Sequence, residues 1–286
     1  MALYHTALGP PAAPRLVVLH GGPGASHDYL LPQMAALADD YRLLFYDQRG
    51  GGRSRSDDRA PVTWRTHVED LAALVQELGL APLTLVGYSW GGLLSLLYAI
   101  AAAGGFGDEG FVLDAPAPVR MVLICPAPAT NALRQQFAAE LARRQRAPWI
   151  EEARAELAAS GLRERDLAAY SKRLFELGVA GYFADPARAR ELTPFRVIGR
   201  VQQSVWESLG DYDLTPKLPL IAAPTLVLHG ALDAIPLASS QLIASALPHG
   251  ELEVLDESAH VPYVEGGETF FAAVRDFLRR TMRAQP

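Results

Sequence analysis

The pentapeptide at residues 87–91 (GYSWG) matches the pattern G-x-S-x-G and places a serine, Ser89, where it could act as a nucleophile. An apolar run at 83–88 predicts a strand before it, and an apolar stretch at 90–103 predicts a buried helix after it. A serine at such a sharp turn is held in a strained backbone conformation, and glycine two residues to either side avoids a collision. The following helix N-terminus favours negative charge near the hydroxyl.

A serine nucleophile requires a base, and the base requires an orienting acid. His260 follows the predicted strand 252–255, so we expect it at the same sheet edge as Ser89, whereas His249 precedes that strand at the opposite end. Asp233 follows the predicted strand 225–229 by four residues. The chain order Ser89, Asp233, His260 agrees with this arrangement. The competing carboxylates are Asp211, Asp213 and Asp256.

Backbone amides must stabilise the negative oxygen that forms when a nucleophile attacks a carbonyl group. The amide of Trp90, directly after Ser89, is one candidate. The glycine-rich loop at 20–24 (HGGPG) follows the predicted strand 16–20, and its glycines let the backbone approach a substrate closely. We expect Gly22 to supply the second amide.

The candidate catalytic residues can meet only if the strands that precede them have their carboxyl ends at the same edge of one sheet. Short apolar runs at 16–20, 43–47, 83–88, 121–125, 225–229 and 252–255 alternate with helical patterns. This alternation predicts a mainly parallel sheet with helices on both faces. Residues 131–213 contain no predicted strand and favour four helices, at 133–146, 149–159, 163–178 and 197–208. We expect a helical cap here, inserted into a core of residues 1–130 and 214–286. Long crossover helices are the alternative.

Composition excludes several other classes of protein. The 286 residues are 50% hydrophobic and carry a net charge of −6 without a basic run, which argues against nucleic-acid binding and against a polybasic membrane contact. A single cysteine, Cys125, excludes an internal disulfide framework. We find no spacing typical of a metal site, no cofactor motif, no signal peptide and no membrane span. We therefore expect a cytoplasmic enzyme that acts on a small molecule or short peptide; its oligomeric state stays open.

Three segments together resemble the proline iminopeptidases of the α/β-hydrolase superfamily: 20–24 (HGGPG), 47–54 (DQRGGGRS) and 87–92 (GYSWGG). The likeness covers residues 16–129 and 214–280. It implies an eight-stranded core with a helical cap, and a triad of Ser89, Asp233 and His260. It also implies a cis peptide bond at Gly22–Pro23 and a supporting role for the 47–54 loop, with Arg49 as a buried ion-pair partner.

The sequence departs from this family where the substrate's amino group should bind. Those peptidases hold the amine with carboxylates from the cap and, in some members, from the residue after the triad aspartate. Ala234 follows Asp233 here, and Glu207 is a candidate substitute. The further carboxylates to consider are Glu151, Glu152 and Asp185.

Two activities follow from this departure. The first is an aminopeptidase that releases an N-terminal residue. The alternative is an esterase or amidase for uncharged acyl groups, with a pocket lined by Tyr88 and Trp206. A hydrolase-like fold used for ligand binding or lyase chemistry is a third interpretation, which the serine, histidine and aspartate argue against.

Overall fold

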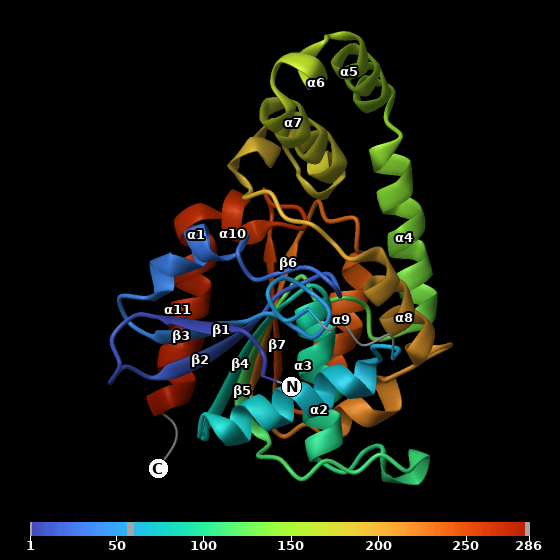
Figure 1. Ribbon diagram of the computed structural model, residues 1–286. Helices are drawn as coiled ribbons and strands as arrows, with labels where there is room; N and C mark the ends of the chain where they lie inside the picture. The colour runs from blue at the N-terminus through green and yellow to red at the C-terminus, as the bar shows by residue number, and fades with distance from the viewer. Residues whose placement is uncertain (1, 56–59, 284–286) are drawn as a thin grey trace.

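A seven-stranded sheet forms the centre of the protein in a computed structural model that describes residues 2–55 and 60–283 (Figure 1). Its order is β1-β3-β2-β4-β5-β6-β7. The edge strand β1 pairs antiparallel with β3, and the other neighbouring strands are parallel. The strands span β1 His5–Leu8, β2 Arg15–Leu19, β3 Arg42–Tyr46, β4 Leu83–Tyr88, β5 Pro118–Ile124, β6 Thr225–Gly230 and β7 Gly250–Leu255.

The six strands predicted from apolar runs are confirmed. The strand β1 is not among the predicted strands, because its four residues (HTAL) are only half-buried and form no apolar run. The family resemblance implies eight strands, and this expectation is wrong for the described residues. They form seven strands, and no described strand lies beyond β1.

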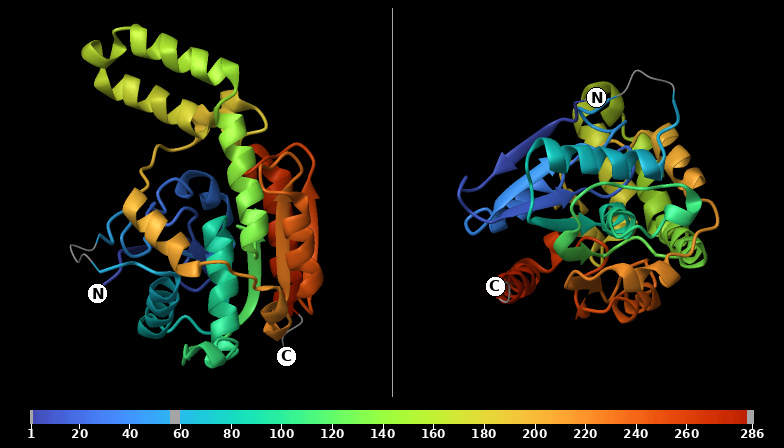
Figure 2. Two further views of the ribbon diagram at one scale, coloured as in Figure 1. Left: turned by 90° about the vertical axis from the view of Figure 1, so that its right-hand side faces the viewer. Right: turned by 90° about the horizontal axis from the view of Figure 1, so that it is seen from below.

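Helices cover both faces of the sheet, as predicted. Alternate strand residues point to opposite faces, so Val17 and Leu19 belong to one hydrophobic cluster and Leu16 and Val18 to another. Helices α2, α3 and α9 pack on the first face, and α1 and α11 on the second (Figure 2). Their bounds are α1 Leu31–Met34, α2 Trp64–Glu77, α3 Trp90–Ala102, α9 Leu237–Ala246 and α11 Gly267–Arg283; α10, at Pro262–Glu265, precedes α11.

Residues 131–213, here called the cap segment, are helical and extend beyond the carboxyl ends of the strands (Figure 2). The cap helices are α4 Asn131–Gln145, α5 Pro148–Ala159, α6 Leu162–Arg165, α7 Leu167–Val179 and α8 Gly199–Leu209. The helix predicted at 163–178 is two helices, because Asp166 caps α7 by accepting a hydrogen bond from the Ala169 amide. The division into a core and a cap remains our proposal. Residues 1, 56–59 and 284–286 of the proposed core lie outside the described residues.

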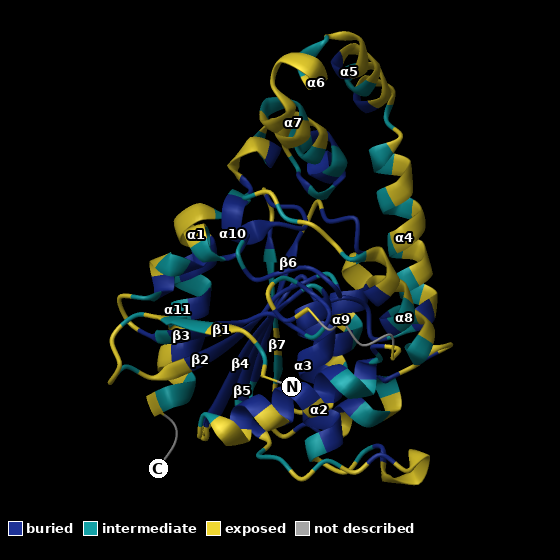
Figure 3. Cartoon of the chain, viewed as in Figure 1, coloured by how far each residue is buried: buried dark blue, intermediate teal, exposed yellow. Residues whose placement is uncertain are grey.

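Burial differs between these two parts. The strands β2 to β6 and α3 are almost entirely buried, whereas β1, β7 and α4 to α7 are more exposed (Figure 3). Five 3₁₀ segments complete the described structure: Ala35–Leu37, Gly107–Glu109, Ala180–Tyr182, Pro186–Glu191 and Thr215–Leu220. Across residues 2–55 and 60–283, every helix falls short of the length or apolarity needed to cross a membrane.

Candidate active site

Ser89 lies at the junction of β4 and α3 with a backbone φ of 51°, in the left-handed region that serine rarely adopts. The flanking glycines make this turn possible. A Cβ at Gly87 would lie 2.3 Å from the Gly91 carbonyl oxygen, and a Cβ at Gly91 would lie 2.2 Å from the Leu19 carbonyl oxygen. The steric reason proposed for the G-x-S-x-G spacing is therefore confirmed.

The structure brings Ser89, His260 and Asp233 together from three separate strand ends. Ser89 Oγ lies 3.0 Å from His260 Nε2, and His260 Nδ1 lies 2.9 Å from Asp233 Oδ2. The other carboxylate oxygen of Asp233 accepts a hydrogen bond from the Ile235 amide at 2.9 Å. The side chains of Asp233 and His260 are 0% and 3% exposed, so the hydrogen bond between them is shielded from water, whereas Ser89 is partly buried.

Charge and hydrogen bonding determine where the protons lie along the hydrogen-bonded series of Ser89, His260 and Asp233. Burial by itself raises the pKa of Asp233, but the facing His260 imidazole and the Ile235 amide hold it below its ordinary value. The carboxylate is therefore ionised at neutral pH and accepts the Nδ1 proton of His260. With that proton on Nδ1, Nε2 is left to accept the Ser89 hydroxyl proton.

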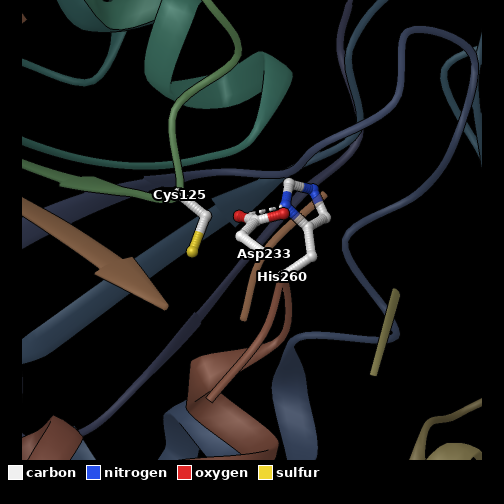
Figure 4. Close-up of side chains that lie close together, drawn as sticks. All are labelled: Cys125, Asp233 and His260. Atoms are coloured by element: carbon white, nitrogen blue, oxygen red, sulfur yellow. Dashed lines mark hydrogen bonds and ion pairs between the residues drawn. The ribbon is translucent and has the colours of Figure 1, made fainter. Parts of the chain in front are cut away.

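Cys125 lies behind the acid, on the side of the carboxylate away from the imidazole (Figure 4). Its φ of 41° is also left-handed, and burial raises the pKa of its thiol well above the usual value. Cys125, Asp233 and His260 each offer one atom that could bind a metal ion, and these three atoms lie within 4.8 Å of one another. However, the carboxylate and the imidazole already bond to each other. We assign the pair to the hydrogen-bonded chain, and the absence of a metal stays a prediction.

The glycine-rich loop lies directly against Ser89. A Cβ added at Gly21 would lie 2.9 Å from the Ser89 Cβ. Gly22 has a φ of 65°, and its carbonyl accepts a hydrogen bond from the Ala25 amide at 2.9 Å. Positive φ at Gly22 and Gly24 shapes this turn without the cis bond implied at Gly22–Pro23. The cis bond among the described residues is instead Ala81–Pro82, which corrects that expectation.

The loop after β3 is hydrogen-bonded to the same region. The Asp47 carboxylate accepts hydrogen bonds from the His27 ring at 2.7 Å and from the Arg53 amide at 2.7 Å. Arg49 forms a two-point ion pair with the buried Asp70, with its Nε 2.8 Å from Oδ2. The ion pair expected for Arg49 is confirmed, but the Arg49 side chain is 31% exposed rather than buried.

A cavity of about 150 Å³ opens beside Ser89 and His260. Both Tyr88 and Trp206, the predicted substrate-binding aromatics, line it. The rest of the lining is mostly aromatic and aliphatic: Tyr29, Phe137, Val179, Tyr182, Leu192, Phe195, Val197, Val261 and Tyr263. Gln202 contributes an amide group from the cap side, and none of the described lining residues is acidic. The site therefore offers an apolar surface to the group bound next to the serine.

Glu207 does not line this cavity. It is exposed on α8 and accepts a hydrogen bond from Gln203 at 2.7 Å. The buried side of α8 carries Val201 and Val205, so the spacing of the helix turns Glu207 toward solvent. Glu151, Glu152 and Asp185 are likewise outside the lining. Ala234, at the position after the acid, is buried and supplies no charge.

A family model described as the alpha/beta hydrolase fold matches residues 14–267. This chain is an α/β hydrolase. A proline iminopeptidase of Clostridium botulinum is 26% identical over 279 residues, covering 93% of this chain and 89% of that protein. The crystal structure of a Mycobacterium smegmatis proline iminopeptidase has a TM-score of 0.66 at 23% identity, covering 99% and 96% of the two chains. An esterase from Exiguobacterium antarcticum has the same TM-score at 22% identity, covering 97% and 95%.

In this α/β hydrolase, the cap segment contacts the histidine directly, a feature that no spacing in the sequence predicted. The carbonyl of Tyr182 accepts a hydrogen bond from the His260 amide at 3.0 Å, and the two rings stack with centroids 5.2 Å apart. The ring of Phe137, from α4, lies 5.7 Å from the imidazole on centroids. Arg144, also from α4, donates to the Asp233 carbonyl at 3.1 Å.

Glu265 links the cap segment to the histidine loop. One carboxylate oxygen accepts the Ala259 amide at 2.8 Å, next to His260 in the chain. The other accepts the amides of Ala184 at 2.7 Å and Asp185 at 3.3 Å. The sequence signal was only an acidic residue five positions after the histidine, which carries no information about these partners.

Glu265→Gln should lower the free energy of unfolding by about 1–3 kcal/mol, because an amide replaces one acceptor oxygen with a donor that faces a backbone N–H. Glu268→Gln is the matched control, since the Glu268 side chain is 82% exposed, and it should change stability by less than about 0.5 kcal/mol. Urea unfolding of both variants measures this. Equal stability of the two would contradict the role given to Glu265.

Two buried histidines should make the protein less stable in acid. Burial lowers the pKa of His20 and of His67 to about 4. Between that value and the unfolded value near 6.5, the unfolded chain binds more protons, so stability is complete above pH ~6.5 and falls toward pH 4. Each histidine accounts for a loss of up to about 3 kcal/mol in the free energy of unfolding over this pH range.

Urea unfolding at several pH values tests this, with His67→Gln as the comparison. The glutamine amide can still donate to the Arg49 carbonyl, which the His67 ring contacts at 3.1 Å. The variant should lose less stability than the wild type between pH 7 and pH 4.5. An identical pH dependence in both proteins would rule out His67 as one of the titrating groups.

Proposed function

We propose that this α/β hydrolase is a serine hydrolase that forms an acyl-enzyme on Ser89. Ser89 Oγ attacks the carbonyl carbon of the substrate while His260 takes the hydroxyl proton. Asp233 stabilises the imidazolium that results. The amides of Gly22 and Trp90 donate to the oxygen that becomes negative. His260 then protonates the leaving group, and a water molecule, activated by the same imidazole, releases the acyl group.

The hydrogen-bonded chain from Ser89 through His260 to Asp233 is the observation that carries this proposal. Both links are within hydrogen-bond distance, at 3.0 and 2.9 Å, and the acid is buried and ionised. A serine hydrogen-bonded to an imidazole nitrogen has a base for its proton, whereas a serine in an ordinary turn has none. The glycine-rich loop against Ser89 provides backbone close to the site where the oxyanion would form.

We infer that the acyl group of the substrate is apolar and uncharged, as in a small ester or amide. The cavity beside Ser89 is lined by aromatic and aliphatic side chains, and its described lining contains no carboxylate. Moving a charged amine into such a site without an anionic partner costs several kcal/mol. The cavity volume of about 150 Å³ suits a compact group such as a short chain or a single ring.

Release of an N-terminal residue, as in a proline iminopeptidase-like aminopeptidase, is the second candidate. The curated relatives with that name favour it, because the one from Clostridium botulinum matches 93% of this chain. A proline ring is itself apolar and compact. Its amine would meet the Gln202 amide rather than a carboxylate, so on this alternative it binds best in its neutral form.

Ser89→Ala should abolish turnover of every substrate and leave the fold intact, because alanine removes only the attacking oxygen. The paired assay uses a short-chain p-nitrophenyl ester and an L-proline anilide, each with wild type and Ser89→Ala. Circular dichroism of both proteins checks the fold. Undiminished hydrolysis by folded Ser89→Ala would refute the mechanism.

The same assay separates the two substrate classes. We expect efficient cleavage of the ester and weak cleavage of the anilide, with the anilide rate rising with pH as its amine loses its proton. Acetylating the anilide's amine should not abolish its cleavage. Strong anilide cleavage at neutral pH that acetylation abolishes would establish the aminopeptidase and contradict the uncharged acyl group.

A further inference from the structure

Gln48 is a buried amide that touches both segments from which the oxyanion donors come. It follows β3 and is 1% exposed. Its side-chain carbonyl accepts a hydrogen bond from the Trp90 indole at 2.8 Å. Its side-chain NH₂ donates to the His20 carbonyl at 2.9 Å. Its backbone N–H donates to His20 Nε2 at 3.1 Å.

His20 extends this chain of hydrogen bonds into the glycine-rich loop. Because Nε2 accepts the Gln48 amide, the ring proton is on Nδ1, which lies 2.9 Å from the Gly21 carbonyl and donates to it. Burial lowers the pKa of His20 to about 4, so the ring keeps this neutral form at the pH where the enzyme is expected to work. The bonds therefore run from Trp90 through Gln48 and His20 to Gly21.

The two segments need such a connection because they are far apart in the chain. Gly22 follows β2, whereas Trp90 begins α3 after β4. The strands β2 and β4 pair with each other, and their last paired residues are Leu19 and Gly87. Beyond that point the sheet no longer fixes the separation of the two backbones. Gln48 reaches both of them just past the last paired residues.

We propose that Gln48 is a positioning residue for the oxyanion site: it fixes the Gly22 amide and the Trp90 amide relative to each other. The proposal rests on the proposed function, in which these amides stabilise the transition state. A buried glutamine that only satisfies its own polar groups would affect stability. A positioning glutamine affects the binding of the transition state more than the binding of the substrate.

Gln48→Met keeps the length of the side chain and removes its hydrogen bonds. We expect kcat to fall by about 10- to 100-fold, which is no more than the loss caused by removing one oxyanion hydrogen-bond donor completely. KM should change by less than about threefold. The affinity for a trifluoromethyl ketone, which forms a tetrahedral adduct with the serine, should fall by the same factor as kcat. Gln76→Met is the matched control, since Gln76 is an exposed glutamine on α2, and it should leave these quantities unchanged.

Trp90→Phe tests the same link from the other side, because it removes the indole donor and keeps the backbone amide. The double variant with Gln48→Met should lose little more than Gln48→Met alone, since both changes break one chain of bonds. If Gln48→Met does not fold, Trp90→Phe still has to lower kcat and ketone affinity in parallel.

Three results would overturn the proposal: unchanged kcat in folded Gln48→Met, a loss confined to KM, or independent losses in the double variant. Ser89→Ala separates this failure from failure of the proposed function. If Ser89→Ala is inactive while Gln48→Met is unaffected, only the role of Gln48 is wrong. If Ser89→Ala is active, the serine mechanism itself is wrong.

Discussion

The left-handed backbone of Ser89 is the constraint around which this site is organised. With φ at 51°, the serine turns sharply from β4 into α3, and its hydroxyl oxygen lies 3.0 Å from His260 Nε2. The turn leaves no space for side chains at Gly87 and Gly91, since Cβ atoms there would lie within 2.4 Å of carbonyl oxygens. Strained conformations of this kind persist when the surrounding structure holds them in place. Here β4 is buried and paired on both sides, and α3 is buried along almost its whole length.

The other proposed catalytic groups follow from that position because parallel strands end at one edge of the sheet. This is why the sequence predicted Ser89, Asp233 and His260 from strand ends alone, and why the structure brings them together. What the sequence did not predict is the network that holds them. Gln48, Tyr182 and Glu265 act through buried hydrogen bonds to residues distant in the chain, and no periodicity encodes such partners.

The structure also differs from the sequence-based predictions at β1 and at Glu207. The strand β1 was missed because an edge strand with a half-buried pattern lacks the apolar run that marks the inner strands. Glu207 is predicted near the substrate because α8 does line the cavity, but the helical period turns Glu207 to the solvent side of that helix. Hydrophobic pattern identifies an element more reliably than it identifies which side chain enters a cavity.

The apolar cavity and the curated relatives point to different substrates for one chemistry. The relatives are named proline iminopeptidases, whereas the described lining of the cavity contains no group that would pair with a protonated amine. In the mechanism we propose, both substrates form an acyl-enzyme on Ser89, so that intermediate is the claim on which the account depends.

Mass spectrometry of the wild-type protein quenched during turnover of a p-nitrophenyl ester tests this claim most directly, with Ser89→Ala as the control. The account predicts an added acyl mass on the peptide that contains Ser89, and none at that position in Ser89→Ala. Hydrolysis that continues with the acyl group on another residue, or with no acyl group on either protein, would contradict it.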